Sequence, residues 1–135
     1  MTNEQTVQAM VENWARAIEQ GNRAGILADH SSDLLMFDFP GEVEGRDAYS
    51  KTWDFFYQNP RGPIQFTPRD FRVAAGDTVA FVTCEIHCDG TSAGPLDFRL
   101  TTGFEKVDGN WTITHEHHSV RTIEERFGGS AEQRS

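Results

Sequence analysis

The most informative part of this chain is Asp108-Gly109-Asn110-Trp111-Thr112-Ile113-Thr114-His115-Glu116-His117-His118-Ser119. Its short Asp-Gly-Asn turn lies between two runs of strand-like residues and predicts a β-hairpin. Side chains alternate along a strand, so one face carries Trp111, Ile113, His115, His117 and Ser119 and the other carries Glu116 and His118. Trp111 and Ile113 predict that the first face is turned to the core. A regular strand then carries His115 and His117 inward as well.

Three further strands are predicted before this hairpin closes. The runs 64–74, 78–88 and 95–107 are rich in strand-forming residues and are separated by turn signals. Cys84 and Cys88 lie four residues apart in one of these runs, a separation of about 13 Å along a strand. A disulfide needs Cα atoms within about 7 Å. We therefore expect two small, buried, unbonded cysteines.

Helices are predicted before the sheet. Val7, Val11, Trp14 and Ile18 form an apolar stripe, with a Thr2–Gln5 capping box before it and Gly21 after it. A second helix is expected over 22–30, a turn over 31–33, a buried strand over 34–39 and a third helix over 46–58. Helices grouped before hairpins imply an α+β fold in which helices cover one face of a curved sheet. Such a sheet leaves a hollow suited to a small molecule.

The chain resembles the SnoaL-like branch of the NTF2-like superfamily, to which ketosteroid isomerases and polyketide cyclases also belong. The resemblance rests on the element order, on Gly45-Arg46-Asp47-Ala48, on Arg99-Leu100-Thr101 and on the closing stretch quoted above. It implies an NTF2-like cone, in which three N-terminal helices pack on a strongly curved, mainly antiparallel sheet that encloses a pocket. It also implies a homodimer formed through the open face of the sheet. We expect a single domain over 1–127 and a disordered tail over 128–135.

Asp38 is the first candidate for catalysis. It interrupts the apolar run Leu34 to Phe39 and precedes Pro40-Gly41. Apolar surroundings disfavour a charged carboxylate, which prepares the group for acid/base work near neutral pH. The resemblance adds that ketosteroid isomerases place their base on the strand after the second helix, near this position. Two alternatives remain: a pocket-lining carboxylate without a catalytic role, and a turn aspartate bonded to the backbone.

The isomerases also use a first-helix tyrosine and a second, protonated aspartic acid. Here the first helix presents Trp14, and no second aspartate matches. Steroid isomerisation itself is therefore not expected.

The histidines form the second candidate group. Imidazoles exchange protons near neutral pH, so His115 and His117 can form an acid/base pair with Asp38 across the pocket. In the alternative, His115 is a hydrogen-bonded strand residue and His118 lies at an interface. The His-x-His pattern also suggests a metal, with His87, Glu85 or Asp38 as third ligand. The spacing selects no third ligand and the resembled family usually lacks a metal, so the expected cofactor is none.

Five residues are expected to bind the substrate: Trp14, Trp53, Phe56, Arg99 and Thr101. Arg99 and Thr101 share a strand face, and an arginine in a pocket can grip a carboxylate through two hydrogen bonds. The alternative for Arg99 is a salt bridge at the rim, which stabilises little. The aromatic residues are core residues by default, and those that face the hollow predict an apolar ligand.

Composition limits the partners. The chain has 135 residues, with 12 Lys and Arg against 21 Asp and Glu, and a net charge of −9 at pH 7. An acidic chain without a basic run is a poor ligand for nucleic acids and for anionic membranes. No apolar run approaches 18 residues and no leader is recognisable, so a cytoplasmic location is expected.

The expected function is cofactor-free acid/base catalysis on a small apolar carbonyl compound, of the isomerase, cyclase or dehydratase type. A second hypothesis is a non-catalytic ligand-binding or dimerisation module of the same fold. A third is a metal-dependent, hydrolase-like site on the His-x-His strand.

Overall fold

A six-stranded sheet forms the frame of the molecule. The structure is a computed structural model that describes residues 1–39, 41–92 and 94–121. The elements are α1 (Asn3–Gln20), α2 (Arg23–Leu27), β1 (His30–Phe37), β2 (Glu42–Glu44), α3 (Arg46–Thr52), the 3-10 helix η1 (Phe55–Tyr57), β3 (Gln65–Ala75), β4 (Val79–Asp89), β5 (Leu96–Val107) and β6 (Asn110–Ser119). The predicted tail over 128–135 and the end of the predicted domain lie outside the described residues.

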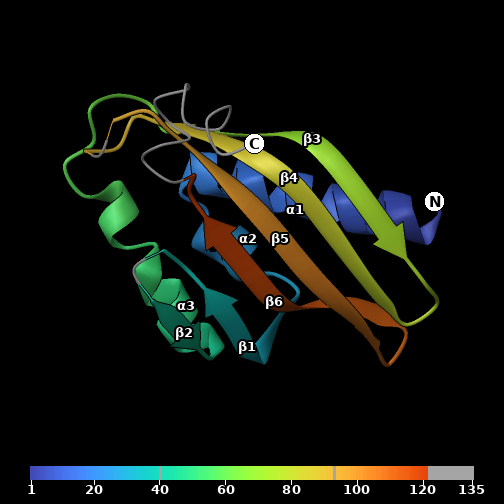
Figure 1. The fold of residues 1–135 in the computed structure, drawn as a ribbon. Helices are drawn as coiled ribbons and strands as arrows, with labels where there is room; N and C mark the ends of the chain where they lie inside the picture. The colour runs from blue at the N-terminus through green and yellow to red at the C-terminus, as the bar shows by residue number, and fades with distance from the viewer. Residues whose placement is uncertain (40, 93, 122–135) are drawn as a thin grey trace.

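The sheet is mainly antiparallel and has helices on one side (Figure 1). Its strands lie in the order β2-β1-β6-β5-β4-β3, and only the β1–β6 pair is parallel. We call the side that α1 covers the inner face and the opposite side the outer face. This arrangement confirms the expected α+β fold. Among the described helices, none is long and apolar enough to cross a bilayer.

Helix α1 forms for the reasons visible in the sequence. The Thr2 side chain accepts a hydrogen bond from the Gln5 backbone N–H, and the Gln5 side chain accepts one from Thr2 N–H. Gly21 ends the helix in the left-handed conformation, with φ 66°. The apolar stripe packs on β3 and β4, so its fixed position closes the inner side of the sheet.

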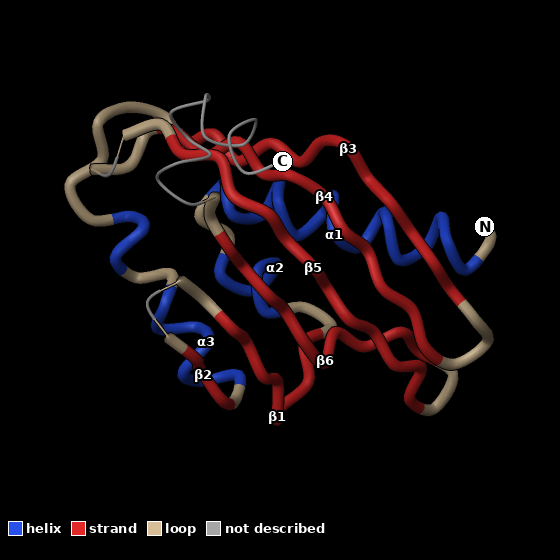
Figure 2. The backbone as a smooth tube through the Cα atoms, in the orientation of Figure 1, coloured by secondary structure: helices blue, strands red, loops and turns tan. Residues whose placement is uncertain are grey.

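The segment between α1 and β3 differs from the prediction (Figure 2). Helix α2 ends at Leu27, and residues 31–33, expected as a turn, belong to β1. Asp29 has a φ of 60°, which stops the helical path, and its carbonyl oxygen accepts a hydrogen bond from Ile113 N–H at 2.7 Å. Pairing with β6 therefore overrides the local preference and makes His30 the first residue of β1. Strand β2 was not expected, and the third helix ends at Thr52 rather than at residue 58.

A β-bulge in β6 decides which side chains reach the interior. Phe104 of β5 pairs with Ile113, but its neighbour Gly103 pairs with His115, so Thr114 has no partner on β5. One extra residue reverses the faces of all that follows it. Glu116 and His118 are consequently buried on the inner face together with Ile113. The expectation that His115 and His117 point inward is wrong, because it assumed a regular strand.

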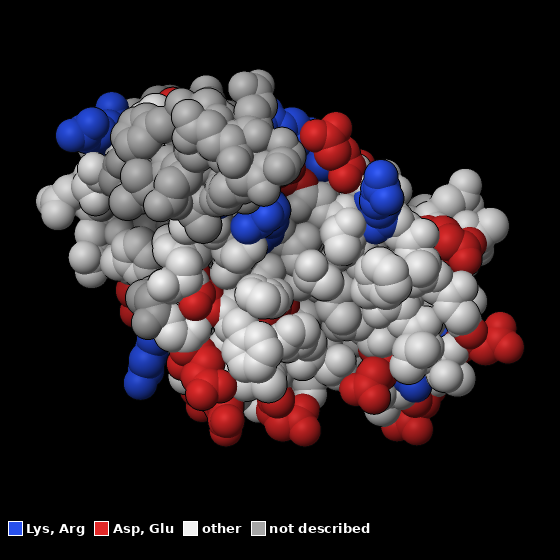
Figure 3. Space-filling view, viewed as in Figure 1, with Lys and Arg blue, Asp and Glu red and all other residues white. Residues whose placement is uncertain are grey.

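The core lies between the inner face and the helices. It includes Trp14, Ile18, Leu34, Met36, Tyr49, Trp53, Phe66, Ile86, Phe98, Leu100, Phe104, Trp111 and Ile113. Cys84 and Cys88 belong to it and form no disulfide, as their spacing predicts. On the outer face, Figure 3 shows a mostly uncharged middle with Asp and Glu side chains gathered along the lower edge.

Candidate functional site

An apolar pocket of ≈ 130 Å³ opens on the inner side of the sheet, beside α3 and η1. Its lining consists of Met36, Asp38, Phe39, Thr52, Trp53, Phe55, Phe56, Cys88, Thr91, Leu96, Phe98 and His118. Most of these side chains are apolar, and the lining also contains one carboxyl group, that of Asp38, and one imidazole, that of His118. The volume is close to that of an engineered cavity of about 150 Å³ that binds benzene. The pocket therefore has room for about one ring.

Behind the pocket, Glu116 accepts three hydrogen bonds in the protein interior. Its Oε2 accepts from His30 Nε2 at 2.7 Å and from Tyr49 Oη at 2.8 Å, and its Oε1 accepts from His118 Nε2 at 2.9 Å. Tyr49 Oη in turn accepts from Trp14 Nε1 at 2.8 Å. We call these five residues the buried network. It fixes one carboxylate between two imidazoles.

The protonation states of the buried network follow from its contacts. Burial raises the pKa of Glu116, but hydrogen bonds from His118 and His30 outweigh this effect and hold the pKa at about 2. Burial and the neighbouring Glu116 charge raise the pKa of Tyr49 well above its ordinary value. Glu116 is thus a carboxylate, and Tyr49 keeps the hydroxyl proton that it donates.

His30 makes two polar contacts through its ring. Nδ1 lies 2.8 Å from the carbonyl oxygen of Ala28, and Nε2 contacts Glu116. The ring also stacks on Tyr49, with centroids 4.8 Å apart. Burial lowers the pKa of His30, but the hydrogen bond and the charge of Glu116 raise it more, so the pKa lies above its ordinary value of 6.5.

His118 connects the buried network to the pocket. Its Nε2 is held by Glu116, its ring stacks on Phe98 with centroids 5.2 Å apart, and the ring lines the pocket. Within the described part of the chain, Nδ1 of His118 has no hydrogen-bond partner. The Nε2–Glu116 contact leaves Nδ1 as the ring nitrogen available to a molecule in the pocket. A carboxylate-oriented imidazole at an apolar cavity is the arrangement of a general base.

Asp38 lies at the pocket mouth and shares the pocket with His118, not with His115 or His117. It follows the end of β1, and its Oδ1 accepts a hydrogen bond from Phe39 N–H at 2.8 Å. Its backbone also exchanges two hydrogen bonds with Gly41. The pocket-lining and turn alternatives therefore both describe its position, because the same residue closes a turn and borders the cavity.

His115 and His117 lie on the outer face. His115 Nδ1 contacts the Leu35 carbonyl oxygen at 2.8 Å, and both rings meet Phe37 edge to face at 5.1 and 5.6 Å. His115 is thus the hydrogen-bonded strand histidine of the alternative interpretation. Throughout residues 1–39, 41–92 and 94–121, no group of three or more His, Cys, Asp or Glu side chains is placed to hold a metal ion.

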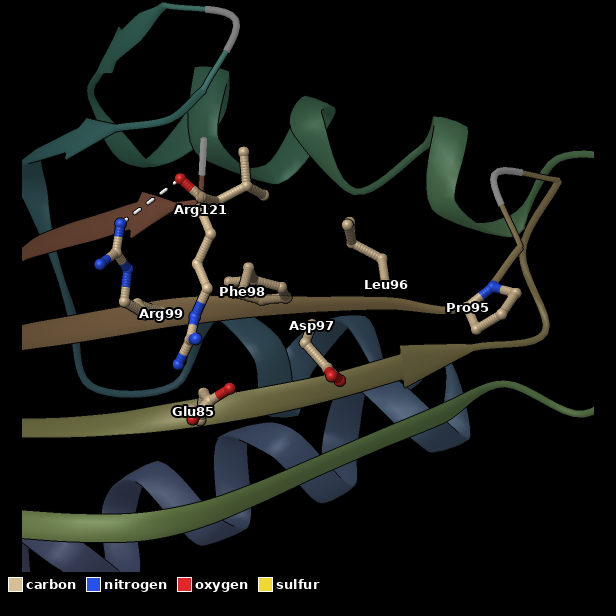
Figure 4. A pocket seen from close by; sticks show the side chains of 8 residues that line it. Glu85, Pro95, Leu96, Asp97, Phe98, Arg99 and Arg121 are labelled. Carbon is tan, nitrogen blue, oxygen red and sulfur yellow. Dashed lines mark hydrogen bonds between the residues drawn. The ribbon is translucent and has the colours of Figure 1, made fainter. Parts of the chain in front are cut away.

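Arg99 and Thr101 also face outward, so the expectation that they contact a ligand in the pocket is wrong. Their strand β5 alternates regularly, with Phe98, Leu100 and Thr102 buried on the inner face. Arg99 borders a separate groove of ≈ 410 Å³ together with Glu85, Asp97 and Arg121, and it donates a long hydrogen bond of 3.4 Å to the Val120 carbonyl oxygen (Figure 4).

The groove is a surface of ion pairs rather than a closed site. His87 Nδ1 lies 2.7 Å from Asp97, and Arg69 lies 3.4 Å from Asp97 and 3.5 Å from Glu85. The hydrogen bond from His87 lowers the pKa of Asp97. His87 and Glu85 therefore lie on the outer face, but among the described residues they do not join His115 and His117 in a group that could hold a metal ion.

The three aromatic candidates divide into two groups. Trp53 and Phe56 line the pocket. Trp14 instead donates its indole N–H to Tyr49 and belongs to the buried network. Trp53 Nε1 is buried and has no hydrogen-bond partner among the described residues.

Sequence reasoning did not predict that four residues would lie together in the interior: Glu116, His118, His30 and Tyr49. The available signal was Gly103, because a glycine inside a strand often marks a bulge. An ideal Cβ at Gly103 would lie 3.4 Å from the Cβ of His115, which is the residue that follows the bulge. A bulge at this point reverses the predicted faces of the residues that follow Thr114.

Comparisons with known proteins agree with this architecture. The fold matches an NTF2-like protein of unknown function from Pseudomonas putida with 24% identity and a TM-score of 0.80, over 90% of this chain and 89% of that chain. A protein from Shewanella frigidimarina proposed to be a ketosteroid isomerase matches with 19% identity and a TM-score of 0.68, over 82% and 92%. A CamKII hub homology domain from Chlamydomonas reinhardtii matches with 21% identity and a TM-score of 0.72, over 90% of this chain and 100% of that chain.

At these identities the structural matches show the fold alone. A comparison with curated proteins finds no match. The family model of the SnoaL-like domain matches residues 7–123, which is most of the chain. The chain therefore has the fold of the NTF2-like proteins that it matches and belongs to the SnoaL-like domain family.

Proposed function

We propose that this protein is a cofactor-free acid/base enzyme that moves a proton within a small apolar carbonyl compound. The observation that carries the proposal is His118, whose Nε2 is bonded to the buried Glu116 while its ring lines an apolar pocket. Isomerisation, cyclisation and dehydration all need such a proton transfer. The likeness to a protein proposed to be a ketosteroid isomerase agrees with this class of reaction.

In the proposed mechanism, His118 Nδ1 accepts a proton from the carbon next to the carbonyl group. Glu116 stabilises the imidazolium that forms, because its carboxylate lies 2.9 Å from Nε2. The His118 imidazolium then returns this proton to another atom of the bound intermediate, so the histidine is neutral again when the product leaves, and Asp38 borders the same pocket at its mouth. The surrounding Trp and Phe side chains provide an apolar wall for the uncharged part of the substrate.

The pocket volume limits the substrate. A cavity of ≈ 130 Å³ has room for about one ring, whereas a four-ring steroid exceeds it. We therefore propose a monocyclic or comparably small carbonyl compound that is uncharged at its apolar end.

Hydrogen exchange tests the proposal without knowledge of the natural substrate. Cyclohexanone and acetophenone are incubated with the protein in deuterium oxide, and deuterium uptake next to the carbonyl group is followed by NMR. The wild-type protein is expected to exceed the buffer rate, and His118→Gln is expected to fall to it. His117→Gln is the matched control, because it removes an imidazole one residue away on the outer face, and it should leave the rate unchanged. Exchange at the buffer rate with both ketones, or loss in His117→Gln but not in His118→Gln, would overturn the proposal.

A second candidate function is a ligand-binding or dimerisation module, and it rests on the outer face. Phe37, Val79 and Phe81 are exposed there by 38, 58 and 48% of their surface. The middle of that face is mostly uncharged (Figure 3), and a CamKII hub domain shares the fold. We propose that a second copy of this chain covers the face, giving a homodimer through the sheet.

Sedimentation velocity tests this interface. Phe81→Glu is expected to convert a dimer into a monomer, while Phe55→Glu, which changes an exposed phenylalanine on the pocket side, should leave the dimer intact. A wild-type monomer at tens of micromolar would exclude the dimer and leave the pocket proposal untouched.

A further inference from the structure

We propose that His30 is a positively charged positioning residue that balances the charge of Glu116 and so keeps His118 neutral, with Nδ1 free to accept a proton. The inference rests on the proposed function of His118 and adds the reason why that residue is ready to act as a base. It is carried by the hydrogen-bond geometry of the buried network.

The two ring contacts of His30 determine its charge. A backbone carbonyl oxygen can only accept, so Nδ1, which lies 2.8 Å from the Ala28 oxygen, carries a proton. Nε2 lies 2.7 Å from Glu116 Oε2, and this oxygen also accepts the hydroxyl proton of Tyr49. A carboxylate that accepts from both neighbours requires a proton on Nε2 as well. With both nitrogens protonated, His30 is an imidazolium.

One positive charge is sufficient for Glu116. The carboxylate has side-chain exposure of 1% and His30 of 0%, so water screens neither charge. His118 contacts the other carboxylate oxygen and needs to donate only one hydrogen bond to it. A second imidazolium beside the first would leave a net positive charge in the core. The neutral form of His118 is therefore favoured while His30 is charged.

The other groups near the two imidazoles do not change this balance. Tyr49 keeps its proton, and Asp29 adds a negative charge that favours the charged form of His30. Arg46 donates to the backbone oxygen of His30 at 3.3 Å, from outside the network.

On the pocket side, Asp38 and Cys88 line the same cavity as His118, and burial raises the pKa of Cys88 to about 11, so this thiol is uncharged. Asp38 lies at the mouth and forms no hydrogen bond with His118 within the described part of the chain. The charge nearest to His118 is therefore that of Glu116.

Replacement of His30 by an uncharged residue should transfer the positive charge to His118. In His30→Gln, the amide can still donate to Glu116, but the carboxylate charge has no counterion. His118 then binds a proton at higher pH than in the wild-type protein, with a titration midpoint raised by roughly 1 pH unit or more. The hydrogen exchange of the proposed reaction would move to higher pH by the same amount.

The test is NMR of the ring nitrogens in the full chain, with the five histidines assigned by single His→Gln variants. In the wild-type protein, His30 should show two protonated nitrogens from pH 5.5 to 8, and His118 should show a proton on Nε2 only at pH 8. Tyr49→Phe is the matched control, because it removes a hydrogen bond to the same oxygen without removing charge. It should move the His118 midpoint by much less than His30→Gln does.

Two results would overturn the inference: a neutral His30 ring at pH 7 in the wild-type protein, or equal His118 midpoints in His30→Gln and wild type. The first measurement needs no variant, so it decides the matter even if His30→Gln does not fold. Neither measurement involves a substrate. A charged His30 in a protein that exchanges no ketone hydrogen would support this inference and reject the proposed function.

Discussion

Glu116→Gln is the substitution that examines the buried network most directly. The side chain keeps nearly the same shape, but it loses its charge and gains an amide that donates. One of the three donors that now face Glu116 would then meet another donor, and His30 would lose its counterion. The expected result is a marked loss of stability without a change of fold.

Two estimates of this loss agree. Breaking a buried ion pair by removing one partner costs about 3–5 kcal/mol. Independently, a pKa for Glu116 of about 2 in place of 4.5 corresponds to about 3 kcal/mol of stabilisation of the charged form. For a chain of this length, such a loss lowers the melting temperature by roughly 10 °C.

The loss should depend on pH in a defined direction. The pKa of Glu116 is lowered on folding, so its contribution is present above pH 4.5 and disappears as the pH falls towards about 2. The pKa of His30 is raised, so its contribution is present below pH 6.5 and disappears as the pH rises through the folded value. The difference between wild type and Glu116→Gln is therefore largest between these two limits.

Urea denaturation followed by tryptophan fluorescence at pH 3, 5.5 and 9 measures this difference. Glu85→Gln is the control, because it neutralises a partly exposed carboxylate on the outer face that pairs with Arg69 at 3.5 Å. Surface ion pairs contribute about 0–1 kcal/mol, so this variant should lose little. If Glu116→Gln costs no more than Glu85→Gln at pH 5.5, the assignment of charge to the buried network is wrong.

Three further outcomes are expected from other parts of the fold. Trp111→Ala should lose about 3–5 kcal/mol in the same assay, because the buried indole ring leaves a cavity; a loss below 1 kcal/mol would contradict its inward position. Cys84 and Cys88 should resist alkylation at pH 8 in the folded protein and react in urea, because burial raises their pKa values to about 12 and about 11; equal rates in both states would contradict their burial. Gly90→Ala should lose on the order of 1–3 kcal/mol or more, because φ is 91° and a Cβ would collide with the backbone oxygen of Pro63, while Gly109→Ala, with open space around it, should lose less.

Local signals in the sequence were sufficient for the long elements. Thr2, Gln5 and Gly21 mark the ends of α1 by hydrogen bonds within a few residues, and the structure confirms them. The predicted runs for β3 to β6 agree with the observed strands to within one residue at each end. Both kinds of signal depend on near neighbours, which a single sequence contains.

The site depends on long-range pairing, which the sequence alone does not contain. His30 was expected at the end of a helix, but pairing of β1 with β6 places its ring 2.7 Å from Glu116, 86 residues away. Thr114 was counted as an ordinary strand residue, and this single miscount exchanged the inner and outer faces at His115, Glu116, His117 and His118. The sequence therefore predicted the last strand correctly but assigned its histidines to the wrong faces of the sheet.

The unpaired Thr114 has a consequence for how the last strand can change in length. Before Thr114, the side chains of Trp111 and Ile113 are buried on the inner face. After it, those of Glu116 and His118 are buried on the same face. A chain without Thr114 would pair as an ordinary regular strand and would keep both sets of side chains where they are. Loss of His115, the other residue of the bulge, would have the same effect, whereas loss of Thr112 or His117 would turn inner side chains outward. The bulge is therefore where β6 can shorten without exchanging its two surfaces.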